Sequence, residues 1–420
     1  MLLHVVRILV LSDLFPPIAY GGYERECAAA TDYLRSRHDV LVLTSTHRRR
    51  DAPADPNVIR ALPDTSGGGR VRVLVRSPAA AAHAARTARS VLDRFQPDLV
   101  FVWEVGMAPQ ASVVAAASAG IPIAYRFCTQ SAARHFAEDP FLRALRPVTR
   151  STGPLLAWRA GVRLTNRLPE LRLRPERHRA AIAWVSEALR RKVGVPDDIE
   201  PALERVIWPA THRSDRFAKV KRELATVPTM AFVGRITIDK GIDVPISALR
   251  VMRDECAISA RLLVAGPEDR RERRRLEAIA RDVGVAEQIE WLGMLDFEGL
   301  AVLLARAHAL VIPSRWYEPF PLVACEAAFG RVPVVASNIG GIPEALTPDD
   351  HALFFPPEDV KGCAAALTRV ILEPGESAAR AERAFRHAQA HFGVERYQAA
   401  IDHFLQDAVR TLSASRSGPT

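Results

Sequence analysis

The 420-residue chain has few cysteines and lacks any long apolar run. Its five cysteines form no C-x-x-C pair, and an odd count favours reduced thiols over a disulfide framework or a zinc site. No stretch reaches about 18 uninterrupted apolar residues, and no small-residue cleavage site follows the apolar N-terminus. We therefore expect a cytoplasmic protein with neither a transmembrane helix nor a signal peptide.

The length exceeds what one ordinary hydrophobic core holds, so it predicts at least two domains. The net charge of +9 is unevenly distributed, because residues 141–180 contain ten arginines against Glu170 and Glu176. Apolar residues are interleaved with these arginines, so the segment could be in peripheral contact with an anionic membrane. It could equally be a flap near an acceptor site or a solvated face. Nucleic-acid binding is not expected, because no recognised module accompanies the charge.

Short apolar runs alternate with helical patterns twice along the chain, which predicts an α/β fold of two Rossmann-like domains with parallel sheets. The first series predicts strands at residues 5–11, 40–44, 71–76, 99–103, 121–125, 182–185 and 206–208. Helices are expected at residues 24–34, 79–95 and 109–119, and Ser186 is expected to cap another. The second series predicts strands at residues 230–233, 260–265, 289–292, 310–313, 332–336 and 353–355. The predicted domains are residues 1–210 and 211–392, followed by a helical segment, 393–420, that packs back on the first domain and ends in a frayed tail.

Two such domains facing one another would align the C-terminal ends of their strands along a cleft, where ligands bind in open α/β sheets. Gly21 and Gly22 follow the first strand and precede a helix, so their backbone could approach a phosphate or could form a plain turn. In the second domain Arg235 and Lys240 follow the first strand. We favour a diphosphate clamp made by these two cations over a solvated loop.

The most informative stretch is residues 312–344, in which Glu318 and Glu326 are separated by seven residues across a loop and a helix. Pro321 suits the first turn of this helix, whose free N–H groups could bind a phosphate oxygen. Carboxylates would repel that phosphate, so we predict that both accept hydrogen bonds from sugar or ribose hydroxyls. The structural alternative is that Glu318 is solvated and that Glu326 caps or pairs within the fold.

Four motifs resemble the family-four glycosyltransferases, which are retaining enzymes of the GT-B fold. They are Phe-Val-Gly-Arg…Lys-Gly (232–241), Val-Ala-Gly (264–266), Leu-Gly (292–293) and Pro-Ser…Glu-Pro-Phe-Pro-Leu…Glu…Gly-Gly-Ile-Pro-Glu (313–344). The match is dense over residues 229–346 and looser elsewhere. The resemblance implies a nucleotide-diphospho-sugar donor, with UDP favoured over GDP, held mainly by the second domain.

The resemblance implies three catalytic residues: Arg235 and Lys240 would contact the diphosphate, and Glu318 would contact the donor sugar. Retention would come from front-face attack, and the leaving diphosphate would help deprotonate the acceptor. No D-x-D triplet occurs, which agrees with a fold that needs no metal, and no cofactor is expected. The implied donor-binding residues, with Glu326 at the ribose, are Gly21, Gly22, Gly234, Gly266, Leu292, Phe320, Pro321, Leu322 and Glu326.

Two departures concern the reacting groups. Pro321 stands where the family usually has glycine, which removes one possible N–H donor. The family's His-Asp pair is replaced by the segment 126–130, so no catalytic histidine is assigned, and the nearby His135 is more simply a structural or surface residue. Glu104, directly after a predicted strand, is the better candidate for the acceptor site. The alternative interpretation is that Glu104 is an ordinary loop carboxylate.

The sequence thus predicts a metal-independent retaining glycosyltransferase that acts on an acceptor hydroxyl of a small molecule or natural product. A polysaccharide or a lipid-linked sugar is an alternative acceptor. A sugar-nucleotide epimerase of the GT-B fold is a second alternative, although it needs a general base for which no candidate is evident. A binding module that holds the nucleotide without transfer is a third.

Overall fold

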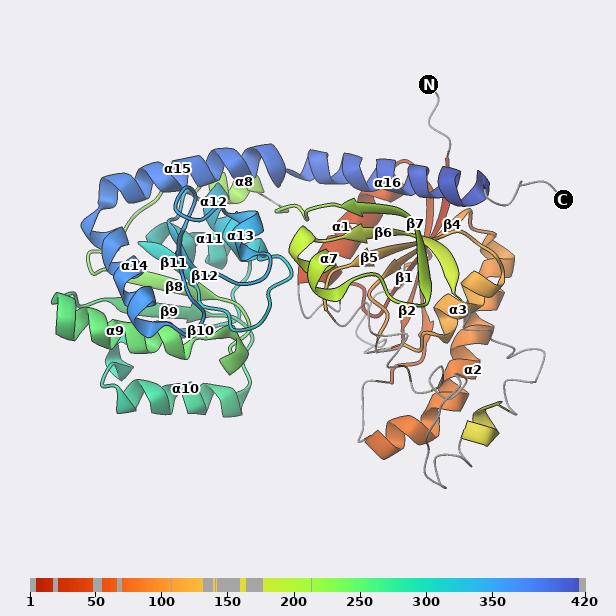
Figure 1. Ribbon diagram of the computed structural model, residues 1–420, viewed down its shortest axis with the longest axis horizontal. Helices are drawn as coiled ribbons and strands as arrows, with labels where there is room; N and C mark the ends of the chain where they lie inside the picture. Colours follow the sequence, from red (N-terminus) through yellow and green to blue (C-terminus); the bar gives the residue numbers. More distant parts are fainter. Residues whose placement is uncertain are drawn as a thin grey trace. The chain divides into compact units, whose positions relative to one another are not determined.

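The computed structural model describes residues 5–17, 22–47, 55–65, 70–106, 108–130, 139, 141, 159–163, 177–212 and 214–414. The chain divides into two compact units (Figure 1). Unit 1 contains residues 1–207 and 398–420, and unit 2 contains residues 208–397. No helix among the described residues combines the length and the apolar content that crossing a membrane requires.

Unit 1 is built on a parallel sheet with the strand order β3-β2-β1-β4-β5-β6-β7. Strand β4 (Leu-Val-Phe-Val-Trp) is buried at every position, as expected of a parallel strand covered on both faces. The strands are β1 (Arg7–Ser12), β2 (Asp39–Ser45), β3 (Val58–Leu62), β4 (Leu99–Trp103), β5 (Ile123–Phe127), β6 (His178–Trp184) and β7 (Ile199–Val206).

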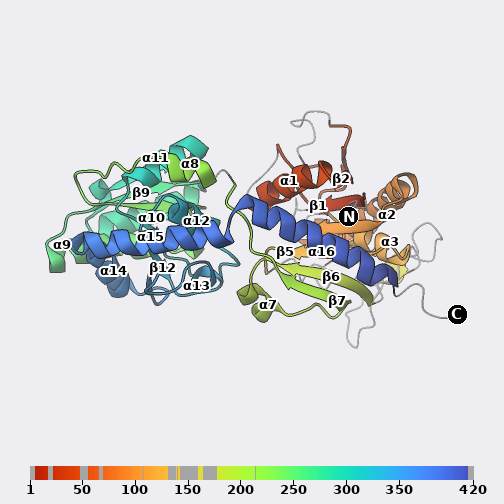
Figure 2. The same ribbon diagram turned by 90° about the horizontal axis from the view of Figure 1, so that it is seen from above.

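The helices of unit 1 follow the predicted alternation. Ser186 caps α7 as predicted, since its hydroxyl accepts a hydrogen bond from the N–H of Leu189 at 3.0 Å. Helix α16, in blue, passes over this unit in Figure 2, and Asp402 on it contacts His38 before β2 at 2.8 Å. The helices are α1 (Gly22–Arg35), α2 (Arg70–Phe95), α3 (Ala111–Ser118), α7 (Glu187–Val193) and most of α16 (Val394–Ala414).

Two predicted strands of this unit are wrong. Residues 71–76 lie in α2, because the place beside β2 is taken by β3, which pairs with it in parallel. The prediction missed β3 because four of its five residues are only half-buried, as befits an edge strand. The strand predicted at 206–208 instead spans residues 199–206, as β7 (Ile199–Val206). Its charged residues and Pro201 are not typical of a buried strand, so the sequence did not indicate an edge strand there.

Unit 2 has a second parallel sheet, with the order β10-β9-β8-β11-β12-β13, and each predicted strand of this series is present within two residues of its predicted bounds. The prediction of an α/β fold with two parallel sheets is therefore confirmed. The strands are β8 (Thr229–Val233), β9 (Arg261–Ala265), β10 (Ile289–Gly293), β11 (Ala309–Ile312), β12 (Val334–Ser337) and β13 (Leu353–Phe355).

Helices cover both faces of the unit 2 sheet: Figure 1 shows α9 and α10 below it and α12 and α15 above it. Phe232, Leu249 and Val311 belong to the core between the sheet and the helices. The helices are α8 (Ser214–Lys219), α9 (Asp243–Cys256), α10 (Arg270–Asp282), α11 (Phe297–Arg306), α12 (Leu322–Phe329), α13 (Ile342–Ala345), α14 (Val360–Leu372) and α15 (Pro374–His391), with 3-10 turns η4 (Ile238–Lys240) and η5 (Ala286–Gln288).

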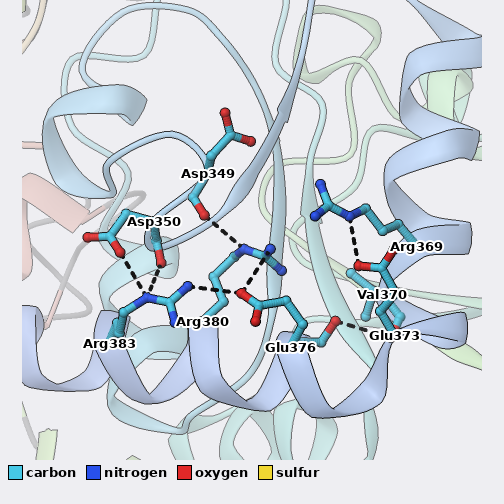
Figure 3. A network of polar contacts seen from close by, with 9 residues as sticks. Asp349, Asp350, Arg369, Val370, Glu373, Glu376, Arg380 and Arg383 are labelled. Atoms are coloured by element: carbon cyan, nitrogen blue, oxygen red, sulfur yellow. Dashed lines mark hydrogen bonds and ion pairs between the residues drawn. The ribbon is translucent and has the colours of Figure 1, made fainter.

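Two arginines of α15 hold the turn that precedes β13 (Figure 3). Arg380 donates to the carbonyl of Asp349 at 3.1 Å, and Arg383 meets the carboxylate of Asp350 at 2.8 Å. Both arginines also reach Glu376, at 3.4 and 3.1 Å. Burial lowers the pKa of Arg380, and these acceptors compensate part of its desolvation. The network fixes this turn against α15.

Each sheet has one point at which its strand order reverses. In unit 1 the reversal lies between β1 and β4, and in unit 2 it lies between β8 and β11. In open α/β sheets, ligands bind outside the C-terminal ends of the strands at such points. The residues that follow β1, β4, β8 and β11 are therefore the places to look for chemistry.

Candidate functional site

Lys240 and Glu318 meet at the point of reversal in unit 2. The ammonium nitrogen of Lys240 lies 2.6 Å from Oε2 of Glu318, and the hydroxyl of Ser314 donates to the same oxygen at 3.2 Å. The two charged side chains are only 17% and 16% exposed. A charge-assisted hydrogen bond in such a partly dry place is stronger than the same pair on an open surface. Two of the three predicted catalytic residues are thus brought together.

Gly241 lets the turn that carries Lys240 approach the end of β11. Its φ is +72°, in the left-handed region that glycine adopts without penalty. A Cβ at this position would lie 1.9 Å from the carbonyl oxygen of Pro313. Only glycine therefore permits η4 to pack this closely against the segment that leads to Glu318.

Gly340 and Gly341 support the backbone of Glu318 from the other side. The N–H of Gly341 donates to the carbonyl of Glu318 at 2.7 Å. Gly340 has φ +62°, and a Cβ there would lie 2.3 Å from the same carbonyl oxygen. The glycine pair thus has a role that the sequence did not reveal: it sets the position of the loop that carries Glu318.

Gly234 and Gly266 draw the C-terminal ends of neighbouring strands together. Gly234 donates to the carbonyl of Ala265 at 3.0 Å, and Gly266 donates to that of Gly293 at 2.8 Å. A Cβ on Gly266 would lie 1.8 Å from the carbonyl oxygen of Gly234. Gly266 is thus required for packing at this edge, whereas a Cβ on Gly234 would only contact the ring of Phe232 at 3.5 Å. Leu292 lies half-buried near the end of β10.

Arg235, the third predicted catalytic residue, directly follows Gly234. Its side chain is 58% exposed, and its nearest described carboxylate is that of Asp239, 3.9 Å away. The guanidinium is therefore held far less tightly than the ammonium of Lys240, and it does not belong to the Lys240–Glu318 contact.

The start of α12 lies directly after the Glu318 loop. Pro321 is the N-cap residue, one position before the first turn in which it was predicted, and Leu322 is the first helical residue. Phe320 is buried and lies edge-on to Phe392 at 5.5 Å, so its side chain belongs to the core of unit 2. Only the backbone of Phe320 is left to face a ligand. Glu326 is half-buried, one turn further along the helix.

In unit 1 the ends of β1 and β4 carry a buried carboxylate each. The carboxylate of Asp13 accepts hydrogen bonds from the N–H groups of Gly106 and Ala108, at 2.6 and 2.8 Å. It thereby holds the loop that follows β4. Glu104, the predicted acceptor-site candidate, is buried with a φ of +22° and accepts a hydrogen bond from the hydroxyl of Thr129.

Tyr23 in the first turn of α1 shares this acidic surrounding. Burial raises the pKa of Tyr23, and the carboxylates of Glu24, Glu104 and Asp13 raise it further, so the phenol stays neutral. Neither Tyr23 nor Asp13 was predicted from the sequence. Position was the only signal for them, since Asp13 directly follows a buried strand and Tyr23 lies in the first turn of the next helix.

Arg126 begins the segment 126–130, which stands where the family pattern has its His-Asp pair. Its guanidinium is fully buried and donates to Glu26 at 2.7 Å and to the carbonyl of Trp184 at 3.1 Å. A buried, paired arginine holds its proton permanently and cannot act as a base. This position therefore has a structural role.

Several predicted features lie outside the described residues: Gly21, His135 and most of the arginine-rich segment 141–180. Gly22 is described, and it is the exposed first residue of α1. Within the described part of the chain, no group of three or more His, Cys, Asp or Glu side chains is arranged to hold a metal ion.

Comparison with known proteins gives consistent matches. Residues 214–387 match the family described as glycosyl transferases group 1. A glycogen synthase of Mycobacterium tuberculosis is 27% identical over 413 residues, which cover 92% of this chain and 91% of that protein.

Among solved structures, the sucrose-phosphate synthase from Thermosynechococcus elongatus has a TM-score of 0.71 at 18% identity, over 95% of this chain and 98% of that one. Anabaena HepE in complex with UDP-glucose has a TM-score of 0.67 at 16% identity, over 96% and 100% of the two chains. At these identities the likeness shows the fold, which is GT-B.

Proposed function

We propose that this chain is a group 1 glycosyltransferase, a retaining enzyme that uses a nucleotide-sugar donor, as the match over residues 214–387 and the likeness to a glycogen synthase support. The proposed donor is a UDP-sugar. The proposed acceptor is a small molecule or natural product that offers a hydroxyl group and carries no phosphate. The observation that carries the proposal is the Lys240–Glu318 contact at the point where the unit 2 sheet reverses its order.

The donor half of the reaction needs positive charge beside the diphosphate and acceptors beside the sugar. Lys240 and Arg235 supply the cations, and the N–H groups at the start of α12 add partial positive charge. Glu318 accepts hydrogen bonds from sugar hydroxyls, and its contact with Lys240 fixes the ammonium in place. Glu326 on α12 takes the ribose hydroxyls. Lys240, Arg235 and the N–H groups of α12 provide the positive charge that a departing diphosphate requires, so the proposed reaction is metal-independent.

The proposed transfer retains the anomeric configuration by front-face attack. The acceptor oxygen forms a bond to the anomeric carbon on the face from which the diphosphate leaves. The bond between that carbon and the diphosphate oxygen breaks, and the oxygen keeps the electron pair. The acceptor proton moves to the departing diphosphate, whose growing negative charge is stabilised by Lys240 and Arg235.

The acceptor proposal is supported by the carboxylates at the reversal point of unit 1. Glu104 and Asp13 are buried, and Tyr23 stays a neutral phenol beside them. Carboxylates accept hydrogen bonds from hydroxyls and repel phosphates. This surrounding therefore favours a neutral or cationic hydroxylated acceptor over a sugar phosphate.

The choice of UDP is supported by the likeness in fold to HepE, whose structure contains UDP-glucose. All five cysteines are free thiols, which supports the proposal of a reducing, cytoplasmic location.

The test is a transfer assay with UDP-, GDP- and ADP-sugars against neutral and phosphorylated hydroxyl acceptors. We expect nucleotide release coupled to a new α- or β-glycoside whose anomeric configuration matches that of the donor, with UDP-sugars and neutral acceptors preferred. Release of nucleotide without transfer would overturn the proposal. Interconversion of the UDP-sugar without any acceptor would support an epimerase instead.

A further inference from the structure

We propose that Arg315 is a positioning residue that holds Lys240 and Glu318 in register for the donor. The inference rests on the proposed function of that pair as donor ligands. Arg315 lies between β11 and Glu318, in the loop 314–318, and no motif in the sequence pointed to it.

The side chain of Arg315 ties this loop to the turn that carries Lys240. Its Nη2 lies 2.6 Å from Oδ2 of Asp243, and its Nη1 contacts the other carboxylate oxygen, so the two groups form a fork. The same Nη1 donates to the carbonyl of Ile238 at 2.8 Å, and Nε meets Glu358 at 2.6 Å. One planar cation thus joins the 3-10 turn η4, the first turn of α9 and the turn before α14.

The backbone of the loop makes the same connection. The N–H groups of Arg315 and Trp316 both donate to the carbonyl of Asp239, each at 3.0 Å. Asp239 directly precedes Lys240, and Trp316 lies two residues before Glu318. The residues that bond across the two segments are therefore the sequence neighbours of the residues that would bind the donor.

The geometry requires an arginine. The guanidinium side chain is only 25% exposed, and the pKa of Arg315 is raised, mainly by its hydrogen bonds to Asp243. Asp243 lies in the first turn of α9, where a negative charge is favoured by the helix dipole. A lysine ammonium cannot form the fork and also reach Glu358 and a carbonyl in one plane.

The consequence for function follows from the precision that the donor site needs. A misplacement of about 1 Å in a catalytic group can reduce the rate by about 100-fold. Lys240 has a flexible side chain, so the place of its ammonium depends on the turn beneath it. If Arg315 merely stabilised the fold, its loss would lower the melting temperature without a selective effect on the donor.

The experiment measures the dissociation constants of UDP and UDP-glucose, together with kcat, for Arg315→Met, Lys240→Met and the double variant. We expect Arg315→Met to weaken UDP binding by about tenfold and to reduce kcat by about 10- to 100-fold. The double variant should bind UDP no more weakly than Lys240→Met alone, because Arg315 acts through Lys240.

The matched control is Arg253→Met. Arg253 also bonds a carbonyl and a carboxylate within unit 2, those of Gly284 and Asp254, each at 2.7 Å. Its loss should change neither the UDP affinity nor kcat. Arg315→Lys tests the fork: we expect this variant to keep most of the defect, and full activity would overturn the requirement for a fork.

The outcomes separate the two levels of the proposal. If Lys240→Met leaves UDP affinity unchanged, the proposed function of the pair is wrong. If Lys240→Met weakens UDP binding but folded Arg315→Met does not, the role of Arg315 is wrong and the proposed function stands. Additive losses in the double variant would also overturn the positioning role. Should Arg315→Met fail to fold, Glu358→Gln removes one contact only and should give a smaller loss of the same kind.

Discussion

At the scale of single residues, the contact between Lys240 and Glu318 joins the electrostatics of unit 2 to its proposed chemistry. Each charge offsets the desolvation of the other. Removing the cation would leave Glu318 in a partly dry place where the hydroxyl of Ser314 still donates to it. The two residues should therefore respond to substitution both in stability and in activity.

We predict that Lys240→Met lowers kcat/KM for a UDP-sugar by about 100- to 1,000-fold, the usual effect of losing one group that stabilises a developing anion. Steady-state kinetics of nucleotide release measure this. The control is Lys219→Met, because Lys219 pairs with Asp215 on an open surface at 3.4 Å. A similar loss in both variants would contradict the prediction.

The glycine pair behind Glu318 gives a second prediction at this scale. Gly340→Ala should destabilise unit 2 by more than the roughly 1–2 kcal/mol of a left-handed non-glycine residue, because its Cβ also collides with the Glu318 carbonyl. Activity should fall as well, since the loop must shift. Urea unfolding and the transfer assay measure the two effects.

Gly284→Ala is the matched control for Gly340→Ala within unit 2. Gly284 has φ +70°, and a Cβ at this position would come no nearer than 4.0 Å to any other atom, so its substitution carries the conformational cost without a collision. Equal losses of stability in the two variants would contradict the role of the collision.

At the scale of elements, His387 of α15 stacks against His351 in the turn before β13, and His391 packs against His387. The ring of His387 lies 4.5 Å from that of His351 and 4.6 Å from that of His391. Burial is the main cause that lowers the pKa of His387 to about 4, and the two neighbouring histidines contribute to the same shift. Burial also lowers the pKa of His351, although Asp350 opposes this and Arg383 adds to it.

This stack predicts loss of stability in acid. The folded pKa of His387 is below its unfolded value of about 6.5, so below that pH the unfolded chain binds more protons. The contribution of His387 to stability is therefore complete above about pH 6.5 and is lost as the pH falls toward 4. We expect His387→Phe to show a smaller drop in melting temperature between pH 7 and pH 5 than the wild type.

The exposed His403 on α16 provides the control for this pH dependence. His403→Phe should leave the acid-induced drop in melting temperature unchanged. An unchanged drop in His387→Phe would mean that the stack is not the acid-sensitive element.

At the scale of the whole molecule, the chain returns to unit 1 at its end through α16. The carboxylate of Asp402 is 4% exposed and meets His38 at 2.8 Å and Arg37 at 2.9 Å. We predict that Asp402→Ala destabilises unit 1 by about 1–3 kcal/mol, the range for leaving a buried polar group such as the ring of His38 without its hydrogen-bond partner. Urea unfolding followed by a unit 1 tryptophan such as Trp184 measures this.

Asp407→Ala on the same helix is the control, because Asp407 pairs with Arg410 near the surface. It should change stability by less than about 1 kcal/mol. If the two variants unfolded alike, α16 would not be anchored through Asp402.

The sequence predicted the elements whose signal is local. Fully buried strands such as β4 and β11 are continuous apolar runs, and the glycines and the Glu318–Glu326 spacing mark loops at strand ends. The edge strands β3 and β7 escaped because many of their residues are only half-buried or exposed, which removes the apolar signal. Two segments could have paired with β2, namely β3 and residues 71–76. A local sequence pattern cannot predict which of them does so, because the outcome depends on competition between the segments.

The sequence by itself therefore determined the two α/β series, the motifs that resemble those of the family-four glycosyltransferases and the candidate donor residues. Only the tertiary structure decided which of those residues touch: Lys240 meets Glu318, while Arg235 stays apart. It also decided the support behind them. Arg315 reaches Asp243 across 72 positions and Glu358 across 43, because parallel strands bring the loops at their C-terminal ends to one edge of the sheet.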